Sequence, residues 1–343
     1  MKKSKLLSSL PAQDQIMQLL FGPLIAKSIN VAAKFNIADL ISEGGPKTAD
    51  YLAKSTGLDP TALYRILRAL ASLDIFRETE SGKFENTPLS ETLTSTHPNS
   101  IRDYAIYAVH DGNMKTWSKL EEVVHTGKSI FIDTNGCNPW DYFKQNPEVS
   151  EVFNRAMTNL SKNIADAFIE SYNFADCESI CDVGGGQGFF LSAILEKTPE
   201  AKGILFDLPH VIESAKKYLE SNNVQNRIQL ISGNLFESIP KGYSVYIVKH
   251  ILHDWNDEKC LEILKSLRKA IPANGKLIIL DALISEGNEL HPSKWLDLHM
   301  MASLDGKERS EADFNNLLSK TGFQLEMATP LIGIVGIIEA IPV

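Results

Sequence analysis

The residues from Ile180 to Gly188 read Ile-Cys-Asp-Val-Gly-Gly-Gly-Gln-Gly, and an apolar run, residues 189–195, follows directly. A hydrophobic strand that breaks into glycines and continues as a helix is typical of the first turn of a nucleotide-binding βαβ unit. Glycine lets the backbone approach a ligand closely and adopt positive φ. The unpaired N–H groups at the start of the helix favour an anionic ligand group. The stretch therefore predicts a site for a nucleotide-like ligand, and the alternative is an ordinary strand–helix turn.

Strands and helices alternate along the chain from about residue 166. The hydrophobic pattern predicts strands at residues 179–183, 201–206, 228–232, 245–248 and 276–281, and helices at residues 188–197, 212–222 and 257–271. This alternation predicts a parallel sheet covered by helices on both faces. Residues 322–327 and 331–340 read instead as two strands joined by Thr329-Pro330. The expected fold class is α/β, with a mostly parallel, Rossmann-like sheet and a terminal antiparallel hairpin.

The first hundred residues have a mainly helical pattern. Apolar residues recur at helical spacing over residues 13–34. Thr48 and Asp59 are predicted N-caps of two short helices, the second with Pro60 in its first position. Two short strands are expected around the Ser81-Gly82 turn. Together these features predict a winged-helix outline.

Charge favours one of two interpretations of this winged helix. DNA binding would use Arg65 and Arg68 on the second helix, but residues 1–100 contain 11 Lys and Arg against 10 Asp and Glu, and the whole chain has a net charge of −9. A DNA-binding face needs a basic excess to neutralise phosphates. We therefore favour a structural or dimerising module and expect no nucleic-acid partner. The apolar N-terminal helix needs a cover, which is either the core or a dimer interface.

The composition is that of an ordinary globular protein. At 343 residues the chain is long enough for two domains and a substantial core. Its four cysteines lack zinc-type spacing and are too few for a disulfide scaffold, so we expect reduced thiols. Polar residues 13–15 interrupt the first apolar run, so neither a signal peptide nor a membrane span is predicted. We expect a cytoplasmic protein with no membrane partner.

The spacing of the glycines separates two classes of nucleotide ligand. A dinucleotide fingerprint has its third glycine three residues after the second. Here Gly184, Gly186 and Gly188 are each two residues apart, which disfavours a dehydrogenase. The second predicted strand leads into Leu205-Phe206-Asp207-Leu208-Pro209, so the Asp207 carboxylate can accept hydrogen bonds from both hydroxyls of a ribose.

With these motifs the chain resembles the S-adenosylmethionine-dependent small-molecule O-methyltransferases, a family that includes plant caffeate-type and bacterial antibiotic-tailoring enzymes. The resemblance covers nearly the whole chain. It rests on the winged-helix front, the glycine loop, the Asp207 segment, Gly233-Asn234-Leu235-Phe236, His253-Asp254-Trp255 and Gly306-Lys307-Glu308-Arg309. It implies a helical dimerisation domain over residues 1–100, a helical connector over 101–165 that contributes to the substrate pocket, and a cofactor-binding methyltransferase domain over 166–343. It also implies a homodimer through the N-terminal helices.

The same resemblance implies which residues bind the cofactor S-adenosylmethionine and its product S-adenosylhomocysteine. These residues are Gly184, Gly186, Asp207, Asn234, Leu235, Lys249 and Ser161. The family usually has an acidic residue where this chain has Asn234. An amide oxygen can still accept a hydrogen bond from the adenine amino group. The alternative for Lys249 is a solvated strand end.

His253 is the predicted catalytic base. It follows a predicted strand, and residues just beyond the carboxyl end of a parallel strand face the ligand crevice. A phenol has a pKa of about 10 and imidazole one of about 6.5, so a neutral histidine suits proton removal near neutral pH. The resemblance implies that Glu308 and Asp281 flank this histidine. His250 and His253 alone supply too few ligands for a metal, so none is expected.

The predicted acceptor is a small hydroxylated aromatic or polyketide-like molecule. An aromatic and methionine-rich lining suits a flat ligand, although such residues at helical spacing usually belong to a core. The candidate pocket residues are Met157, Trp117, Trp140, Phe153, His299 and Met300, and Met157 matches a substrate-contacting position of the family. Two other functions stay open: an N- or C-methyltransferase, and a winged-helix regulator that senses a small ligand.

Overall fold

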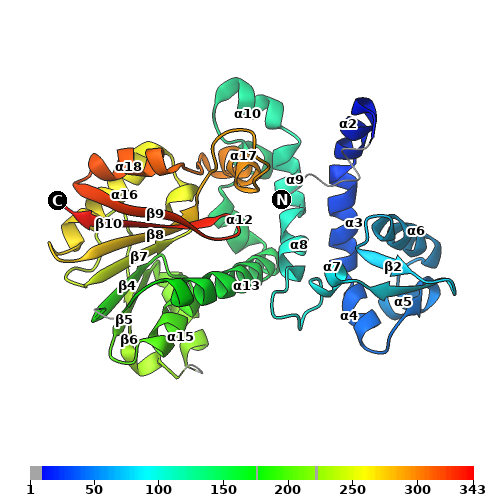
Figure 1. The fold of residues 1–343 in the computed structure, drawn as a ribbon, viewed down its shortest axis with the longest axis horizontal. Coiled ribbons are helices and arrows are strands. Elements are labelled where there is room, and N and C mark those ends of the chain that lie inside the picture. The colour runs from blue at the N-terminus through cyan, green and yellow to red at the C-terminus, as the bar shows by residue number, and fades with distance from the viewer. Residues whose placement is uncertain (1–9, 175–176, 221–222) are drawn as a thin grey trace. The chain divides into compact units, whose positions relative to one another are not determined.

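The computed structural model describes residues 10–174, 177–220 and 223–343 (Figure 1). Within these ranges the chain forms two compact units. The first runs up to Met114 and includes Trp140–Leu160. The second consists of Lys115–Pro139 and Ser161–Val343. The stretch expected as a separate connector is thus divided between the two units.

The second unit contains a seven-stranded sheet in the order β6-β5-β4-β7-β8-β10-β9. All five predicted parallel strands are present, at β4 (Ser179–Val183), β5 (Lys202–Asp207), β6 (Ile228–Ser232), β7 (Val245–Lys249) and β8 (Lys276–Ala282). Their central residues are almost entirely apolar because both faces of the sheet are covered. Burial on both faces also explains why these strands read as continuous hydrophobic runs.

Two layers of helices cover the sheet (Figure 1). One face packs on the last turns of α13 (Pro147–Ser171), on α14 (Phe189–Lys197) and on α15 (Pro209–Leu219). The other face packs on α16 (Asp257–Ala270) and α18 (Glu311–Ser319). Apart from the terminal hairpin, the other elements of this unit are α10 (Leu120–Thr126), α11 (Phe131–Asn135), η1 (Gln225–Arg227), η2 (Leu252–Asp254) and α17 (Ser293–Leu304).

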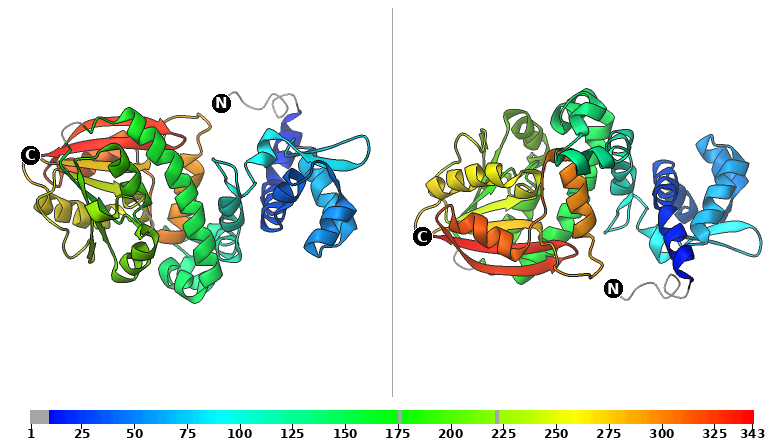
Figure 2. Two further views of the ribbon diagram at one scale, coloured as in Figure 1. Left: turned by 90° about the horizontal axis from the view of Figure 1, so that it is seen from below. Right: turned by 90° about the horizontal axis from the view of Figure 1, so that it is seen from above.

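The terminal hairpin is confirmed, but the predicted position of its turn is wrong. β9 (Phe323–Ile332) and β10 (Val335–Pro342) lie at one edge of the sheet (Figure 2). The turn falls at Gly333, which has a φ of 58°, and Pro330 lies inside β9 opposite Gly336. A proline is tolerated there because β9 is the edge strand and its outer side has no ladder partner.

The first unit has the predicted winged-helix outline. Thr48 accepts a hydrogen bond from the Tyr51 amide at the start of α5, and Asp59 accepts one from the Ala62 amide at the start of α6. The strands β2 and β3 pair around the Ser-Gly turn, and a short strand that the sequence did not reveal, β1, pairs with β3. The elements are α2 (Ala12–Leu20), α3 (Gly22–Lys34), α4 (Ile37–Ser42), β1 (Lys47–Thr48), α5 (Ala49–Thr56), α6 (Pro60–Ala71), β2 (Phe76–Glu78), β3 (Lys83–Asn86), α7 (Pro88–Glu91), α8 (Arg102–Ala108), α9 (Asp111–Trp117), α12 (Pro139–Gln145) and the first turns of α13.

The N-terminal helical run keeps an uncovered apolar face. It is two helices, α2 and α3, which meet at Phe21 with a bend of 41°. Ile16, Leu19, Leu20 and Leu24 expose 58–67% of their surface. In the described part of the chain no single helix has the length and apolar character to cross a membrane, although this bent pair passes on those two criteria together.

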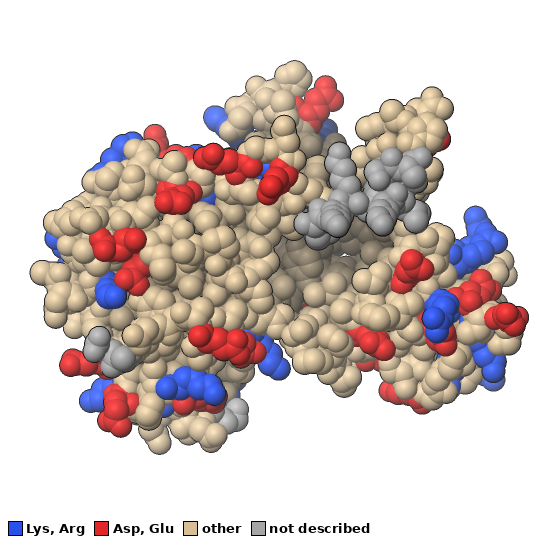
Figure 3. Space-filling model, in the orientation of Figure 1, with Lys and Arg blue, Asp and Glu red and all other residues tan. Residues whose placement is uncertain are grey.

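Charges of both signs are interspersed on the face of the molecule shown in Figure 3. Lys and Arg side chains near the winged helix alternate with Asp and Glu, and no continuous basic surface is visible on this face.

Candidate active site

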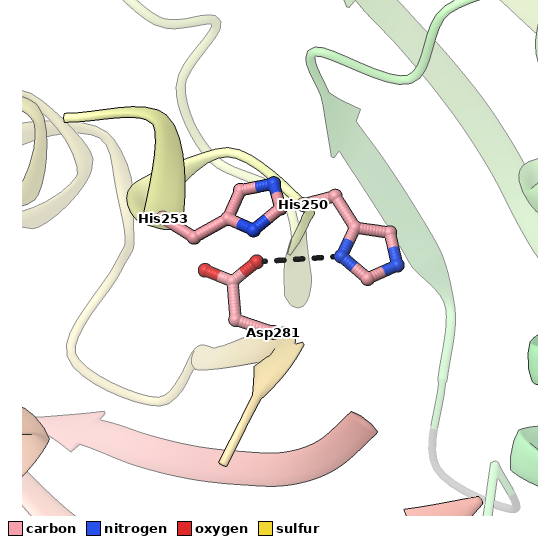
Figure 4. Close-up of side chains that lie close together, drawn as sticks. All are labelled: His250, His253 and Asp281. Atoms are coloured by element: carbon pink, nitrogen blue, oxygen red, sulfur yellow. Dashed lines mark ion pairs between the residues drawn. The ribbon is translucent and has the colours of Figure 1, made fainter. Parts of the chain in front are cut away.

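Two predicted strands, β7 and β8, and the turn η2 bring the catalytic candidates to the carboxyl edge of the sheet. Lys249 pairs in register with Leu280, and the His250 amide donates to the Leu280 carbonyl at 3.0 Å. This pairing places His250 beside Asp281 at the end of β8. The turn η2 then carries His253 back over the same edge, as Figure 4 shows. The imidazole rings of His250 and His253 have centroids 5.2 Å apart.

His253 forms its closest polar contact with Glu308. The His253 Nδ1 lies 2.9 Å from Glu308 Oε1, and the Glu308 side chain is fully buried. The Lys307 amide donates to the His253 carbonyl at 3.0 Å. At Gly306 a Cβ atom would collide with that carbonyl oxygen, so only glycine permits this approach of the two segments. The motif containing Glu308 therefore reaches His253 through backbone packing as well as through its carboxylate.

The carboxyl groups around His253 set its charge. Burial by itself would lower the pKa of His253, but Asp254, Glu308 and Asp281 together raise it to about 10. The Asp254 Oδ1 lies 3.5 Å from the other ring nitrogen, Nε2. These carboxylates therefore favour the protonated form of the imidazole. This differs from the neutral histidine that the ordinary imidazole pKa suggests, because the sequence does not show how many carboxylates converge on the ring.

Asp281 and His250 have polar atoms without hydrogen-bond partners in the described structure. Both Asp281 carboxylate oxygens are buried and unpaired, as is His250 Nδ1, which lies 3.7 Å from Asp281 Oδ1 (Figure 4). Burial raises the pKa of Asp281 to about 7 and lowers that of His250. One ligand atom from each of His250, His253 and Asp281 lies within 4.8 Å of the others. The sequence expectation of no metal is not tested by this arrangement.

The glycine loop has the backbone conformation that a close-lying ligand needs. Gly184, Gly186 and Gly188 have φ values of 72°, 61° and 82°. A Cβ atom on Gly184 would collide with the Ile251 side chain, whereas none of the described atoms lies within 4 Å of the position of a Cβ on Gly186. Asp207 accepts hydrogen bonds from the Gly186 amide at 2.9 Å and from the Leu208 amide at 2.7 Å. Each carboxylate oxygen keeps a further lone pair for a ribose hydroxyl.

The other predicted cofactor residues are Lys249, Ser161, Asn234 and Leu235, and the structure defines the contacts of each. Lys249 Nζ donates to Ser161 Oγ at 3.0 Å, so these two candidates, 88 positions apart, meet in the fold. Lys249 is partly buried rather than a solvated strand end. The Asn234 oxygen accepts from the Phe236 amide at 3.0 Å, and its nitrogen donates to Glu237 at 3.2 Å. Leu235 packs against the core. The Asn234 oxygen thus has one remaining lone pair.

The aromatic candidates for the substrate pocket fall in two groups, one in each unit. In the second unit, Trp117 Nε1 donates to His299 Nδ1 at 3.0 Å, and the neighbouring Met300 is buried. Since an indole N–H only donates, this nitrogen of His299 carries no proton. In the first unit, Phe153 stacks on Phe143 with ring centroids 4.6 Å apart, next to Trp140 and on the same helix as Met157.

Three polar residues of the site escape sequence reasoning. Asp254 lies next to the His253 ring. Asp297 accepts a hydrogen bond from the Glu308 amide at 2.8 Å. Arg309 is fully buried and binds backbone carbonyls around the histidine turn. Asp254 and Arg309 are members of the motifs His253-Asp254-Trp255 and Gly306-Lys307-Glu308-Arg309, and that membership is the signal that could have shown their roles. Asp297 has no such signal.

The glycine loop and the His253–Glu308 pair lie at the carboxyl edge of one parallel sheet, which is the edge where α/β enzymes of this architecture bind their ligands. A family model described as an O-methyltransferase domain matches residues 117–324, and one described as an O-methyltransferase dimerisation domain matches residues 17–96. The chain therefore belongs to the S-adenosylmethionine-dependent O-methyltransferases.

Individual relatives span almost the whole chain. Phenazine O-methyltransferase PhzM of Lysobacter antibioticus is 38% identical over 98% of both chains. The mitomycin biosynthesis 6-O-methyltransferase of Streptomyces lavendulae is 32% identical over 93% of this chain and 91% of its own length. The solved structure of CalO1, a methyltransferase of calicheamicin biosynthesis in its S-adenosylhomocysteine-bound form, is 28% identical, covers 100% of both chains and has a TM-score of 0.86. S-adenosylmethionine is accordingly the cofactor of this protein.

Proposed function

We propose that this O-methyltransferase transfers the methyl group to a hydroxyl of a small, flat aromatic molecule, with His253 as the group that receives the hydroxyl proton. The observation that carries this proposal is the contact of His253 Nδ1 with the buried Glu308 carboxylate at 2.9 Å. A carboxylate on one ring nitrogen fixes the tautomer and stabilises the protonated imidazole. The other ring nitrogen is then left for proton transfer.

Other residues of this chain would bind the cofactor and support the His253 ring. S-adenosylmethionine, when bound, supplies a methyl group on a positively charged sulfur, which is already a good donor. Gly184 and Gly186 would hold its methionine part, Asp207 its ribose, and Asn234 and Leu235 its adenine, with Lys249 and Ser161 as neighbours of the methionine end. Glu308 and Asp281 would hold the His253 ring and stabilise its positive charge. Positioning and proton removal are sufficient chemistry for such a transfer.

The acceptor class is inferred from the aromatic candidates and from the relatives. The relatives named above act on a phenazine and in mitomycin biosynthesis, and both names describe O-methylation. Trp117 and His299, both in the second unit, provide ring surfaces suited to a flat acceptor, and the Phe153–Phe143 stack of the first unit is a separate aromatic group. We infer a phenolic or polyketide-like acceptor from this combination.

A homodimer through the N-terminal helices accounts for the uncovered apolar face. The matched dimerisation domain covers residues 17–96, which include all of α3 and the end of α2. Exposed leucines at helical spacing on these helices would be buried against a second copy of the chain. Such a dimer interface would remove the exposed apolar face of α2 and α3 from water.

A screen of acceptors with mass-spectrometric detection tests the proposed function. The protein is incubated with S-adenosylmethionine and a panel of hydroxylated aromatics, each paired with an analogue in which an amino group replaces the hydroxyl. We expect gain of one methyl group on oxygen, with formation of S-adenosylhomocysteine. Methylation of only the amino analogues would make the protein an N-methyltransferase. Binding of DNA without binding of S-adenosylmethionine would favour the regulator.

A further inference from the structure

Arg309 is a charged residue in the interior of the second unit. Its side chain has 0% exposure and is the largest among the fully buried residues. A buried guanidinium is unfavourable unless all of its N–H groups have partners. The identity and location of those partners therefore show what this residue holds in place.

Every nitrogen of the Arg309 guanidinium donates a hydrogen bond. Nε and Nη2 donate to Asp257 Oδ1 at 3.1 and 2.7 Å. Nη1 donates to the carbonyls of Leu252 at 2.8 Å and Lys307 at 3.1 Å. Nη2 also donates to the Trp255 carbonyl at 2.9 Å. The rigid fork of an arginine can reach these four acceptors together, which the single ammonium of a lysine cannot.

The acceptors surround the two catalytic candidates. The carbonyls of Leu252 and Trp255 lie on either side of His253-Asp254, and the carbonyl of Lys307 immediately precedes Glu308. The Arg309 backbone is also fixed, because its carbonyl accepts from the Ile284 amide at 3.0 Å just beyond the end of β8. One residue thus joins the turn that carries His253, the segment that carries Glu308 and the end of the strand that carries Asp281.

We propose that Arg309 is a positioning residue of the methyl transfer, which holds the His253 turn and the Glu308 segment in register so that their side chains meet. This inference rests on the proposed role of His253 as the proton acceptor. Without the fork, the two segments keep the Lys307–His253 backbone hydrogen bond, the close packing at Gly306 and the His253–Glu308 contact itself. The imidazole and the carboxylate would then separate or tilt.

The structure supplies a matched control in Arg227. This arginine also binds backbone carbonyls, with Nη1 donating to Thr198, Pro199 and Ala201 at 2.8–3.1 Å and Nη2 donating to Leu195 at 2.6 Å. Its acceptors lie around the connection between α14 and β5 and include none of the predicted site residues. Arg227→Lys therefore reproduces the loss of a carbonyl-binding fork without touching the His253 turn.

The test compares Arg309→Lys with Arg227→Lys in the full-length protein. We expect Arg309→Lys to lower kcat by about 10- to 100-fold, the size of effect that a small misplacement of catalytic groups produces. We also expect the acid limb of its pH–kcat profile to move to lower pH, because a weaker Glu308 contact no longer raises the pKa of His253. Binding of S-adenosylmethionine, measured by calorimetry, should stay within about twofold of wild type because the glycine loop is untouched. Arg227→Lys should leave the pH profile unchanged.

A second variant keeps the test decisive if Arg309→Lys does not fold. Asp257→Asn removes the negative charge of the half-exposed carboxylate that binds Arg309 and keeps the guanidinium group itself. It should shift the acid limb in the same direction by a smaller amount. His253→Ala is measured alongside and should be inactive. In that case an unchanged pH profile of the folded Arg309→Lys variant would overturn the positioning role. If only Asp257→Asn folds, an unchanged pH profile of that variant would overturn it. Activity of His253→Ala would instead overturn the role of His253.

Discussion

His253 has three carboxyl groups around its ring, and they make its charge the central property of the site. Asp254, Glu308 and Asp281 outweigh the effect of burial and raise the pKa of His253 to about 10. A phenolic hydroxyl has a pKa of about 10, so proton transfer between the two groups is nearly balanced in energy. The carboxylates thus make His253 a stronger base at the cost of keeping it protonated at neutral pH.

The rate should therefore rise with pH on the alkaline side of neutrality. His253 must be neutral to accept a proton, and with a pKa raised to about 10 the neutral fraction grows about tenfold per pH unit below that value. We expect kcat/KM to increase from about pH 7 to about pH 9, measured with an acceptor whose own hydroxyl pKa has been determined separately. A rate that is flat over this interval after correction for the acceptor would contradict the raised pKa.

Glu308→Gln should separate the orientation of His253 from its charge. A glutamine can still form a hydrogen bond with Nδ1 but removes one of the negative charges that raise the pKa of His253. We expect kcat to fall by about 10²-fold or more, as is typical for loss of acid–base assistance, and the acid limb to shift to lower pH. The binding constant of S-adenosylmethionine, measured by calorimetry, is the control. An unchanged kcat would remove Glu308 from the mechanism.

Among the elements, the turn between β4 and α14 depends on its glycines for different reasons. Gly184 and Gly186 need positive φ, whereas Gly185 needs space. A Cβ atom on Gly185 would lie 2.5 Å from Asp182 Oδ2 and from Leu205 Cδ1. Asp182 is fully buried under the loop, with both carboxylate oxygens unpaired. The loop therefore has no room on its inner side.

Gly185→Ala should weaken both the fold and cofactor binding. The new methyl group must displace Asp182 or Leu205, and overpacking of this kind costs about 1–3 kcal/mol. We expect a lower Tm in thermal unfolding and at least about tenfold weaker binding of S-adenosylmethionine. Gly22→Ala is the matched control, since Gly22 begins the helix α3 with no positive φ and none of the described atoms lies within 4 Å of its Cβ position. Equal effects of the two substitutions would show that the packing under the loop is unimportant.

The elements also show why some features are predictable from sequence and others are not. The strands β4, β5, β7 and β8 are runs of mostly buried, apolar residues, and His253 and Glu308 lie in distinctive short motifs, so a linear pattern reveals them. The partners of Arg309 are mostly backbone carbonyls, which every residue has, so no pattern marks them. The sequence predicts the hairpin turn at Thr329-Pro330 rather than near Gly333 because proline usually ends a strand. Pro330 can lie inside β9 because β9 is the edge strand of the sheet, a position that the sequence does not reveal.

For the whole molecule, the uncovered face of α2 and α3 is the feature that a single chain leaves unexplained. Leu20→Asp, at a residue with 67% exposure, places a charge in the proposed dimer interface. We expect dissociation to monomers in analytical ultracentrifugation, because a buried unpaired charge at an interface is strongly unfavourable. Val124→Asp on α10, where the native residue has 72% exposure, is the control and should leave the association state unchanged. A Leu20→Asp protein that sediments like wild type would exclude this face as the interface.

The assignment of His253 as the proton acceptor is tested most directly by His253→Ala. Turnover of an accepted hydroxylated aromatic and binding of S-adenosylmethionine are measured on the same preparation. We predict that turnover falls by about 10²-fold or more, the range of general base catalysis, while the calorimetric binding constant for S-adenosylmethionine stays near the wild-type value. Turnover at the wild-type rate would contradict the role of His253.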